Sequence, residues 1–243
     1  MMTTKKEERE MSKKYTLHYF DIVGRAESIR LTFAVAGIEF VDHRFVDRDE
    51  FKEMKASGKL FFGQVPALEV TTETDEGRKS VMLTQTAAIM RYVAKIKPET
   101  ELYPSDPILA AKVDAVVDQR GDAYAGLGVA KYKERFGFGF LVDQPDLADK
   151  AIKAWNKEIM PKHLAHLVKL IQVGNTGWIA GTKKPSIADV LWAPDLKALS
   201  DGKASGDDTI LQAFPVLTDY LKRFYSLPSV VNYYDGSVGC RLA

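Results

Sequence analysis

The sequence predicts two unlike domains, an α/β domain followed by an all-helical one. Up to residue 102, short runs of β-branched and aromatic residues alternate with segments of helical periodicity. Beyond that point the strand signals fade, and long helical patterns continue to the end of the chain. Pro98, Pro104 and Pro107 lie between the two halves and indicate a linker.

The first unit of the α/β half is expected to run strand, helix, strand. Residues 15–20 (YTLHYF) place aromatic and apolar side chains alternately on one face, as a short strand does. A helix is expected over 25–37, and Gly37 marks its C-terminal end. Strand character returns at 38–46, and a polar stretch that is helical or irregular covers 47–58.

The second unit is expected to run strand, strand, helix. Residues 64–70 (QVPALEV) have the composition of a buried strand, but Pro66 near its start has no backbone N–H to donate. A hairpin turn and a returning strand are expected over 71–83, and a helix over 84–96. A strand that opens with proline is either an edge strand or has backbone groups reserved for another purpose.

The second half is expected to be a helical bundle. Helical periodicity covers four stretches, at 108–126, 147–171, 187–199 and 218–225. Ser186 and Asp189 have the S-x-x-D spacing of a capping box directly before an apolar run. We interpret this pair as a folding signal and assign it no catalytic role.

Composition excludes several classes of function. Lys and Arg number 34 against 33 Asp and Glu, so no excess charge indicates nucleic acid or a charged membrane surface. The single cysteine, Cys240, cannot form an intramolecular disulfide and indicates a reducing compartment. His163 and His166 are three residues apart but lack an HExxH pattern, so no metal is expected.

The location of the protein is expected to be cytoplasmic. No apolar run approaches the roughly 20 residues that a membrane-spanning helix needs, so no membrane association is expected. Residues 1–13 mix both charges without an apolar core, which is unlike a signal peptide and is typical of a flexible tail.

Five segments, in this order, together resemble the sigma class of the cytosolic glutathione S-transferases: YTLHYFDIVGRAESIRL, FGQVPALEV, QTAAIMRYVAK, VDAVVDQRGDAY and GWIAG…PSIAD. The resemblance covers nearly the whole chain beyond the first 13 residues. It implies a thioredoxin-like glutathione-binding domain over 14–101 and an all-helical domain with the electrophile pocket over 106–243. It also implies a homodimer that conjugates glutathione, its co-substrate, to hydrophobic electrophiles in detoxification, without a metal.

The chemistry of conjugation requires a thiolate, because the thiolate is the form that attacks. A free thiol has a pKa of about 8.5 and is mostly protonated at neutral pH. Lowering that pKa by about two units takes about 3 kcal/mol, which a charge-assisted hydrogen bond and nearby positive potential can supply. By resemblance, Tyr19 is the catalytic hydroxyl donor and Arg25 supplies the potential. Without the resemblance, Tyr19 reads as a core aromatic and Arg25 as a solvated cation.

The resemblance also implies how glutathione is held. A cis Val65-Pro66 bond would leave the Val65 backbone free to pair with the cysteinyl backbone, which explains the proline at the strand start. The start of the helix at Gln85 and Thr86 suits the γ-glutamyl carboxylate, although Thr86 could serve only as a cap. The expected glutathione-binding residues are Tyr19, Arg25, Phe51, Lys55, Gly63, Gln64, Val65, Pro66, Gln85, Thr86 and Asp122.

Asp122 and Phe51 differ from the other expected glutathione-binding residues. Asp122 would reach across the dimer to the γ-glutamyl amine, but from the sequence alone it reads as a solvated helix-face carboxylate. Phe51 stands where sigma-class enzymes usually carry Trp, so the donor to the glycyl carboxylate is lost and Lys55 is left to hold that end. Glutathione is therefore expected to bind several-fold more weakly than in a relative that carries Trp.

Three functions stay open at this point. The leading one is conjugation, with an electrophile pocket near Val23, Tyr124 and Val129. The second is a glutathione-dependent isomerase of the prostaglandin-D synthase type, which Val129 disfavours because it lies roughly where those isomerases carry Trp. The third is a non-catalytic carrier or crystallin-like protein, against which the retention of Tyr19, Arg25, Gln64 and Gln85 argues.

Overall fold

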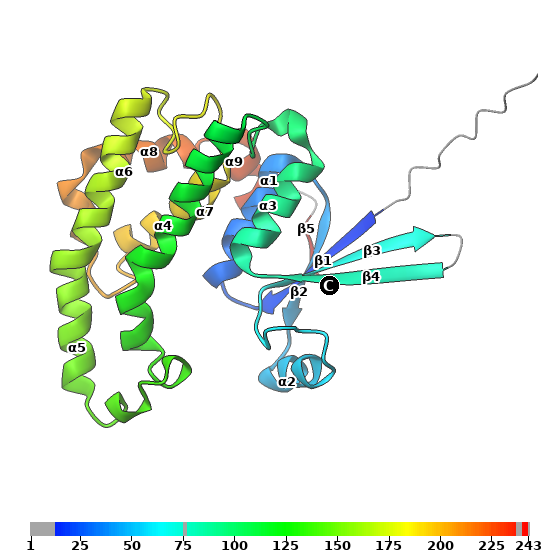
Figure 1. Ribbon diagram of the computed structural model, residues 1–243, viewed down its shortest axis with the longest axis horizontal. Helices are drawn as coiled ribbons and strands as arrows, with labels where there is room; N and C mark the ends of the chain where they lie inside the picture. The colour runs from blue at the N-terminus through cyan, green and yellow to red at the C-terminus, as the bar shows by residue number, and fades with distance from the viewer. Residues whose placement is uncertain (1–12, 75–76, 237–239, 243) are drawn as a thin grey trace, which may run out of the picture.

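The computed structural model describes residues 13–74, 77–236 and 240–242 of the chain. A five-stranded sheet lies beside a set of helices that forms the second half (Figure 1). The expected tail, residues 1–13, lies outside the described residues except for Lys13, where the first strand begins. No helix in the described ranges is both long and apolar enough to span a bilayer.

The first half has the predicted order of strand, helix, strand and then strand, strand, helix. Its elements are β1 (Lys13–Phe20), a 3₁₀ turn (Gly24–Ala26), α1 (Glu27–Ala36), β2 (Phe40–Phe45), α2 (Arg48–Ala56), β3 (Ala67–Thr74), β4 (Gly77–Thr84) and α3 (Thr86–Ile96). The sheet order is β4-β3-β1-β2-β5. β1 is parallel to β2 and antiparallel to β3, and β4 is antiparallel to β3. This is the mixed sheet of a thioredoxin-like domain, so the predicted fold class is confirmed.

The fifth strand was not predicted. β5 (Cys240–Leu242) comes from the end of the chain and pairs in parallel with β2 of the first-half sheet. β2 would otherwise be an edge strand with unpaired backbone groups, and such an edge readily accepts another strand. The range 106–243 is therefore not helical throughout, and the division into 14–101 and 106–243 stays a prediction.

The second half is helical, as predicted. Its helices are α4 (Pro107–Lys131), α5 (Pro145–Ala154), α6 (Met160–Gly174), α7 (Ile187–Ser200), α8 (Pro215–Tyr225) and α9 (Pro228–Tyr234). Short 3₁₀ turns lie at Pro98–Thr100, Glu134–Phe136, Gly139–Leu141 and Ile210–Ala213.

One predicted helix, over residues 147–171, is interrupted. A π-helical stretch (Trp155–Ile159) separates α5 from α6 just before Pro161, which has no N–H to donate to a regular helical turn. The Trp155 indole donates to the Ala123 carbonyl of α4 at 2.7 Å, which fixes the interruption against its neighbour.

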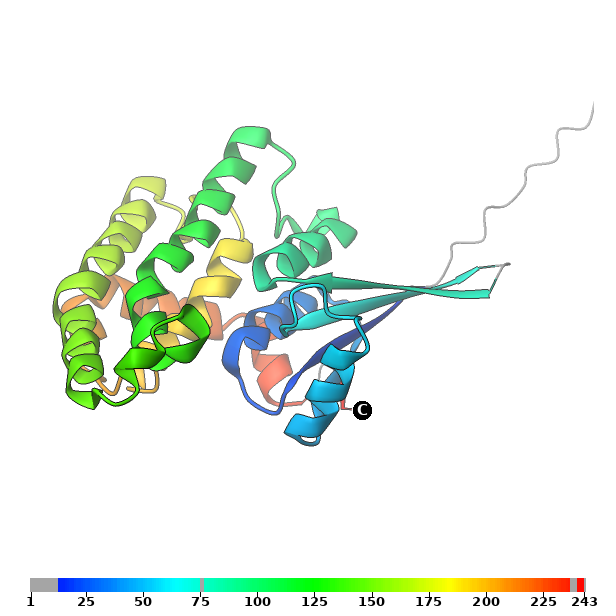
Figure 2. The same cartoon turned by 60° about the horizontal axis from the view of Figure 1, so that its bottom comes forward.

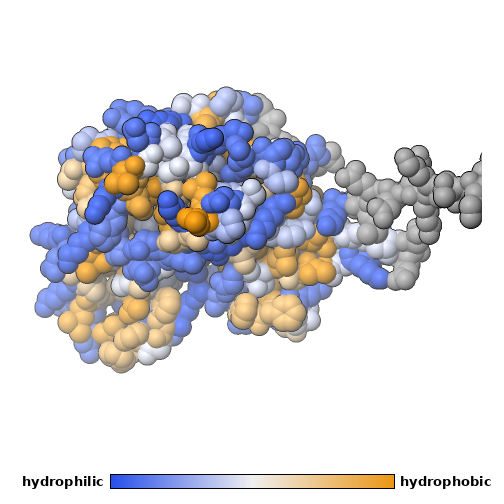
Figure 3. All heavy atoms as spheres, turned by 45° about the horizontal axis from the view of Figure 1, so that its top comes forward, coloured by the Kyte–Doolittle hydropathy of each residue, from blue (hydrophilic) through white to orange (hydrophobic). Residues whose placement is uncertain are grey.

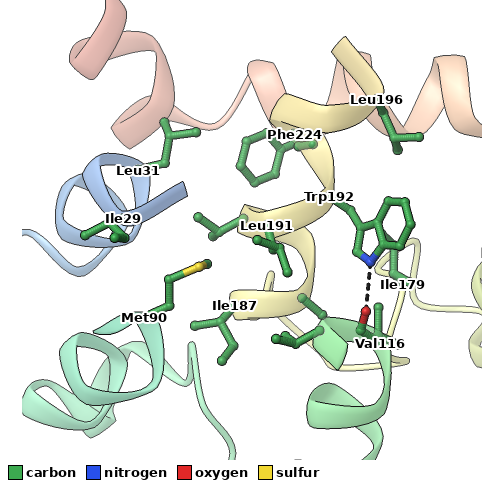
Figure 4. Packing of buried hydrophobic residues seen from close by; sticks show 14 of the residues in the cluster. Ile29, Leu31, Met90, Val116, Ile179, Ile187, Leu191, Trp192, Leu196 and Phe224 are labelled. Atoms are coloured by element: carbon green, nitrogen blue, oxygen red, sulfur yellow. Dashed lines mark hydrogen bonds between the residues drawn. The ribbon is translucent and has the colours of Figure 1, made fainter. Parts of the chain in front are cut away.

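The two halves share one hydrophobic core. α1 and α3 cover one face of the sheet and lie between it and α7, as both ribbon views show (Figures 1 and 2). Leu31 of α1, Met90 of α3 and Leu191 of α7 meet in this layer (Figure 4). The Trp192 indole donates to the Val116 carbonyl at 2.8 Å and ties α7 to α4.

α7 begins with the predicted capping box. The Ser186 backbone N–H and hydroxyl donate to Asp189 Oδ2 at 2.8 and 3.0 Å, and the Ile179 N–H donates to Oδ1 at 2.9 Å. Complete burial raises the pKa of the Asp189 carboxyl, and these hydrogen bonds oppose that effect. All of these contacts are internal, which agrees with a folding role.

α2 packs on the other face of the sheet. Phe51 lies against Phe20 and Phe45, with ring centroids 5.2 and 5.8 Å apart. His43 Nδ1 lies 3.1 Å from the Nδ1 of His18, and its Nε2 is 3.0 Å from Glu50 Oε1 on α2. These contacts hold the helix that carries Lys55 next to the loop before β3.

Candidate functional site

The site is built around the hydroxyl of Tyr19 at the end of β1. The Tyr19 ring is buried with 7% exposure, and its Oη accepts a hydrogen bond from the Arg25 backbone N–H at 3.1 Å. A hydroxyl has one proton to donate and two lone pairs to accept with. Because the Arg25 N–H occupies one lone pair, the Tyr19 proton remains available for a ligand atom, and the hydrogen bond it accepts strengthens it as a donor.

Gly24 makes this geometry possible. Its φ of +42° lies in the left-handed region, where glycine has no steric cost. A Cβ at this position would lie 2.6 Å from Tyr19 Oη, closer than real Cβ atoms come to other atoms. The loop can therefore close over the hydroxyl only with glycine at this position.

The buried side chain of Arg30 binds the backbone of the same loop. Its side chain is fully enclosed, and Nη1 donates to the carbonyls of Ile22 and Val23 at 3.0 and 3.3 Å. Nε lies 3.1 and 3.0 Å from the two carboxylate oxygens of Asp42 on β2, and Glu27 is 3.2 Å from Nη1. Arg30 therefore links the loop to α1 and to the sheet.

A small hollow beside this loop brings six of the predicted residues together. They are Arg25, Gln64, Val65, Pro66, Gln85 and Thr86, and Phe62 and Thr84 complete the lining. The Val65-Pro66 bond is cis, as the resemblance implied. The pairing of β3 begins at Ala67, so Val65 lies just outside the ladder.

The start of α3 forms one wall of the hollow. Gln85 has a φ of +72°, which is unusual for a residue with a side chain and is typical of functional sites. The Thr86 hydroxyl donates to the Arg25 carbonyl at 3.4 Å, and no side chain caps the helix. Thr86 therefore joins α3 to the Tyr19 loop and is not an N-cap, and the helix N-terminus presents N–H groups and positive potential.

Lys55 and Phe51 of α2 lie on the far side of the loop before β3. A Cβ on Gly63, whose φ is +58°, would lie 2.9 Å from Lys55 Cε, so the lysine stem runs directly against this glycine. Lys55 is exposed, and no carboxylate pairs with it in the described ranges. The Phe51 ring is half-buried against Phe20 and Phe45, which shows that it also docks α2.

Two arginines that the sequence reasoning missed lie close to Arg25. The Arg120 guanidinium on α4 makes two hydrogen bonds to Asp195, at 2.5 and 3.1 Å, which offsets its charge. Arg135, from the turn after α4, donates to the Gln64 side-chain oxygen at 2.8 Å. Burial, then Arg120 and Arg135, lower the pKa of Arg25, which shows that positive charge is concentrated here.

The segment that carries Arg135 is rich in exposed aromatic residues. We call residues 132–140 the aromatic segment; Tyr132, Phe136, Phe138 and Phe140 are each at least 39% exposed. Phe136 packs on α4, where its ring would lie 3.5 Å from a Cβ on Gly128. The sequence does show a cluster of aromatic residues, RFGFGF, after the helix. It does not show in which direction the chain turns there, and therefore not that Arg135 reaches Gln64.

The residues expected around an electrophile have different environments. Val23 is 63% exposed on the Tyr19 loop, and Val129 is half-buried on α4. Tyr124 packs against Trp155 and Trp192 at 5.4 and 6.4 Å, and its hydroxyl is enclosed. Burial raises the pKa of the Tyr124 phenol, so this hydroxyl stays protonated near neutral pH.

Asp122 does not join the other predicted residues. It is exposed on α4 and is not among the residues that line the hollow. Its assigned role needs a second copy of the chain and stays a prediction. Within the described ranges, no group of three or more His, Cys, Asp or Glu side chains is placed to hold a metal ion.

The family model "Glutathione S-transferase, N-terminal domain" matches residues 15–95, and "Glutathione S-transferase, C-terminal domain" matches residues 136–236. "Glutathione S-transferase 1" of Ascaris suum is 31% identical over 220 residues, covering 89% of this chain and 93% of that protein. "Glutathione S-transferase alpha-2" of Rattus norvegicus is 27% identical over 223 residues, covering 92% and 89%. The solved structure of a Nu-class GST from Haemonchus contortus has a TM-score of 0.69 at 26% identity, covering 92% and 97%.

A thioredoxin-like domain joined to a helical domain, with a buried tyrosine hydroxyl bonded to Arg25 and a hollow that Arg25 shares with the start of α3, is the arrangement of a two-domain thiol transferase. The chain belongs to the glutathione S-transferase family. It is an enzyme that transfers glutathione, the co-substrate of the family, to electrophilic small molecules. The names of the rat and Haemonchus relatives give the alpha and Nu classes and that of the Ascaris relative gives no class, so these names do not show the sigma class.

The contact between Gly24 and Tyr19 predicts the effect of one methyl group. Gly24→Ala should lower conjugation by about 10², because the new Cβ displaces the hydroxyl of Tyr19, and losing one well-placed donor costs about that much. Gly58→Ala is the matched control, since Gly58 also has a positive φ, +76°, but has no other atom within 4 Å of its Cβ position. Gly58→Ala should lose about 1 kcal/mol of stability from the strain of a left-handed alanine, and Gly24→Ala should lose more because its Cβ also collides with Tyr19. Steady-state assays with glutathione and a chlorinated nitrobenzene measure the difference, and equal activities would contradict the placement of the hydroxyl.

Proposed function

We propose that Tyr19 makes glutathione reactive by donating its hydroxyl proton in a hydrogen bond to the sulfur, which stabilises the thiolate. The thiol proton passes to solvent, the thiolate attacks the electrophilic carbon, and the leaving group departs with the electron pair of the broken bond. The observation that carries this proposal is the hydrogen bond from the Arg25 N–H to Tyr19 Oη, which leaves the phenolic proton free. Arg25 adds positive potential at the same place.

The remaining groups of the hollow fit the rest of the tripeptide. The Val65 backbone, next to the free end of β3, pairs with the cysteinyl backbone of glutathione. The N-terminus of α3 at Gln85 and Thr86 receives the γ-glutamyl carboxylate. Lys55 and Gln64 lie toward the glycyl end. The quoted motifs support assignment of the chain to the sigma class, and the single cysteine supports a cytoplasmic location.

The protein is proposed to act as a two-fold homodimer in which first domains pack on second domains. Two surfaces support this. Phe61 and Phe62 of the first domain are 81% and 62% exposed, and a groove of about 750 Å³ between α4 and α6 is lined mainly by apolar atoms. Hydrophobic residues exposed on the helical half are visible in Figure 3. Large exposed apolar patches are typical of protein interfaces, and a dimer would bring Asp122 toward a second hollow.

Removal of the Tyr19 hydroxyl tests the mechanism. Tyr19→Phe keeps the buried ring and should keep the fold and the affinity for glutathione. Conjugation should fall by about 10² to 10³, the usual loss for one donor to a developing anion. Steady-state kinetics and calorimetric titration with glutathione measure the two effects. Unchanged turnover in a folded Tyr19→Phe variant would remove Tyr19 from the mechanism.

The dimer proposal is tested by light scattering on the active enzyme. We expect twice the chain mass of 27.1 kDa at micromolar protein. Asp122→Ala should remain a dimer but bind glutathione more weakly, because the γ-glutamyl amine loses its carboxylate partner. A fully active monomer would contradict both the dimer and the role of Asp122.

A further inference from the structure

The loop before β3 has a second cation beside it, and this cation comes from the other domain. Arg135 belongs to the aromatic segment after α4, yet its Nη2 donates to the side-chain oxygen of Gln64 at 2.8 Å. Gln64 lines the hollow and Gly63, its neighbour, contacts the stem of Lys55. Lys55 therefore lies against Gly63 and Arg135 bonds the next residue, Gln64, so that the two cations approach neighbouring positions of this loop from opposite domains.

The surrounding structure holds Arg135 in this position. A 3₁₀ turn (Glu134–Phe136) reverses the chain, and the Phe138 N–H donates to the Lys133 carbonyl at 2.8 Å. The Arg135 guanidinium carbon lies 5.9 Å from the centre of the Phe136 ring, which itself packs on α4. An arginine held in this way loses little further freedom when it binds a ligand.

Among the described residues, neither Lys55 nor Arg135 is paired with a carboxylate. Arg120 is paired with Asp195, but in the described part of the chain no carboxylate lies within ion-pair distance of Lys55 or Arg135. The hydrogen bond of Arg135 goes to a neutral amide oxygen. A carboxylate would accept from the same guanidinium in a charge-assisted hydrogen bond, which is roughly twice as strong.

We propose that Arg135 is a glutathione-binding residue that, together with Lys55, holds the glycyl carboxylate. At this position Phe51 has no donor to offer and packs against Phe20 and Phe45. Arg135 replaces that donor from the helical domain, and Gln64 keeps its amide N–H₂ free to donate to the same carboxylate. Because glutathione is the ligand of the proposed function, this role of Arg135 rests on that function.

A glycyl carboxylate bound in this way would connect the two domains. Gln64 belongs to the sheet domain and Arg135 to the segment that follows α4 of the helical half. A carboxylate bound by Lys55 and Arg135 joins the two directly. Glutathione thus fastens the aromatic segment beside the Tyr19 loop, at the place where an apolar electrophile has to approach the sulfur.

Calorimetric titration with glutathione and with its glycyl monoethyl ester tests the assignment, because the ester removes the negative charge of that carboxylate and adds only an ethyl group there. Arg135→Gln should weaken the binding of glutathione about tenfold, and change that of the ester by less than about twofold. Arg135→Lys should recover part of the loss, since lysine keeps the positive charge but lacks the planar guanidinium that can donate two parallel hydrogen bonds. Lys133→Gln is the control: it removes one charge from the same segment and should leave both affinities unchanged.

The outcomes distinguish a failure of the Arg135 assignment from a failure of the proposed function. Equal weakening of glutathione and ester in Arg135→Gln would mean that the arginine acts only by orienting Gln64, and would overturn the assignment. Unchanged affinity for glutathione in that variant would overturn it as well. Failure of the wild-type enzyme to bind glutathione at all would instead overturn the proposed function.

Discussion

The hydrogen bond from the Arg25 backbone N–H to Tyr19 Oη determines how the rest of the site is arranged. It requires the loop after β1 to turn back over the end of the strand, and only a glycine at position 24 leaves room for that turn. The loop carbonyls are in turn held by Arg30, whose charge is balanced by Asp42 on β2 and by Glu27. Burying this guanidinium is tolerable only because it is paired and hydrogen-bonded. The position of the Tyr19 hydroxyl is thus fixed by the core of the sheet domain.

The two domains contribute different physical properties to the site. The sheet domain supplies hydrogen-bonding geometry: a fixed hydroxyl, a free strand end and a helix N-terminus with unpaired N–H groups. The helical half supplies charge and apolar surface through Arg120, Arg135 and the aromatic segment. The buried residues of α1, α3 and α7 pack together in one core (Figure 4). This core fixes the site groups of the two domains relative to each other.

Local sequence signals were sufficient for most of the fold and for part of the site. Strand, helix and turn chemistry gave the order of the first half, and the spacing of Ser186 and Asp189 gave the start of α7. Long-range contacts were not accessible in the same way. β5 was missed because three residues at the end of a chain carry no periodicity, and its pairing depends on the free edge of β2. Arg135 was missed because its contact with Gln64 spans 71 positions and depends on the direction of a turn. Asp122 is the opposite case, since a motif predicted a role that a single chain cannot complete.

The central claim is that the Tyr19 hydroxyl, held by the Arg25 N–H, ionises the thiol of glutathione in the site. The most direct measurement is an ultraviolet difference titration of thiolate absorbance in the complex of the wild-type enzyme with glutathione, followed across pH. The account predicts that the bound thiol ionises about two units below the ~8.5 of a free thiol, so that the thiolate predominates at neutral pH. A bound thiol that ionises at the same pH as free glutathione would contradict the account.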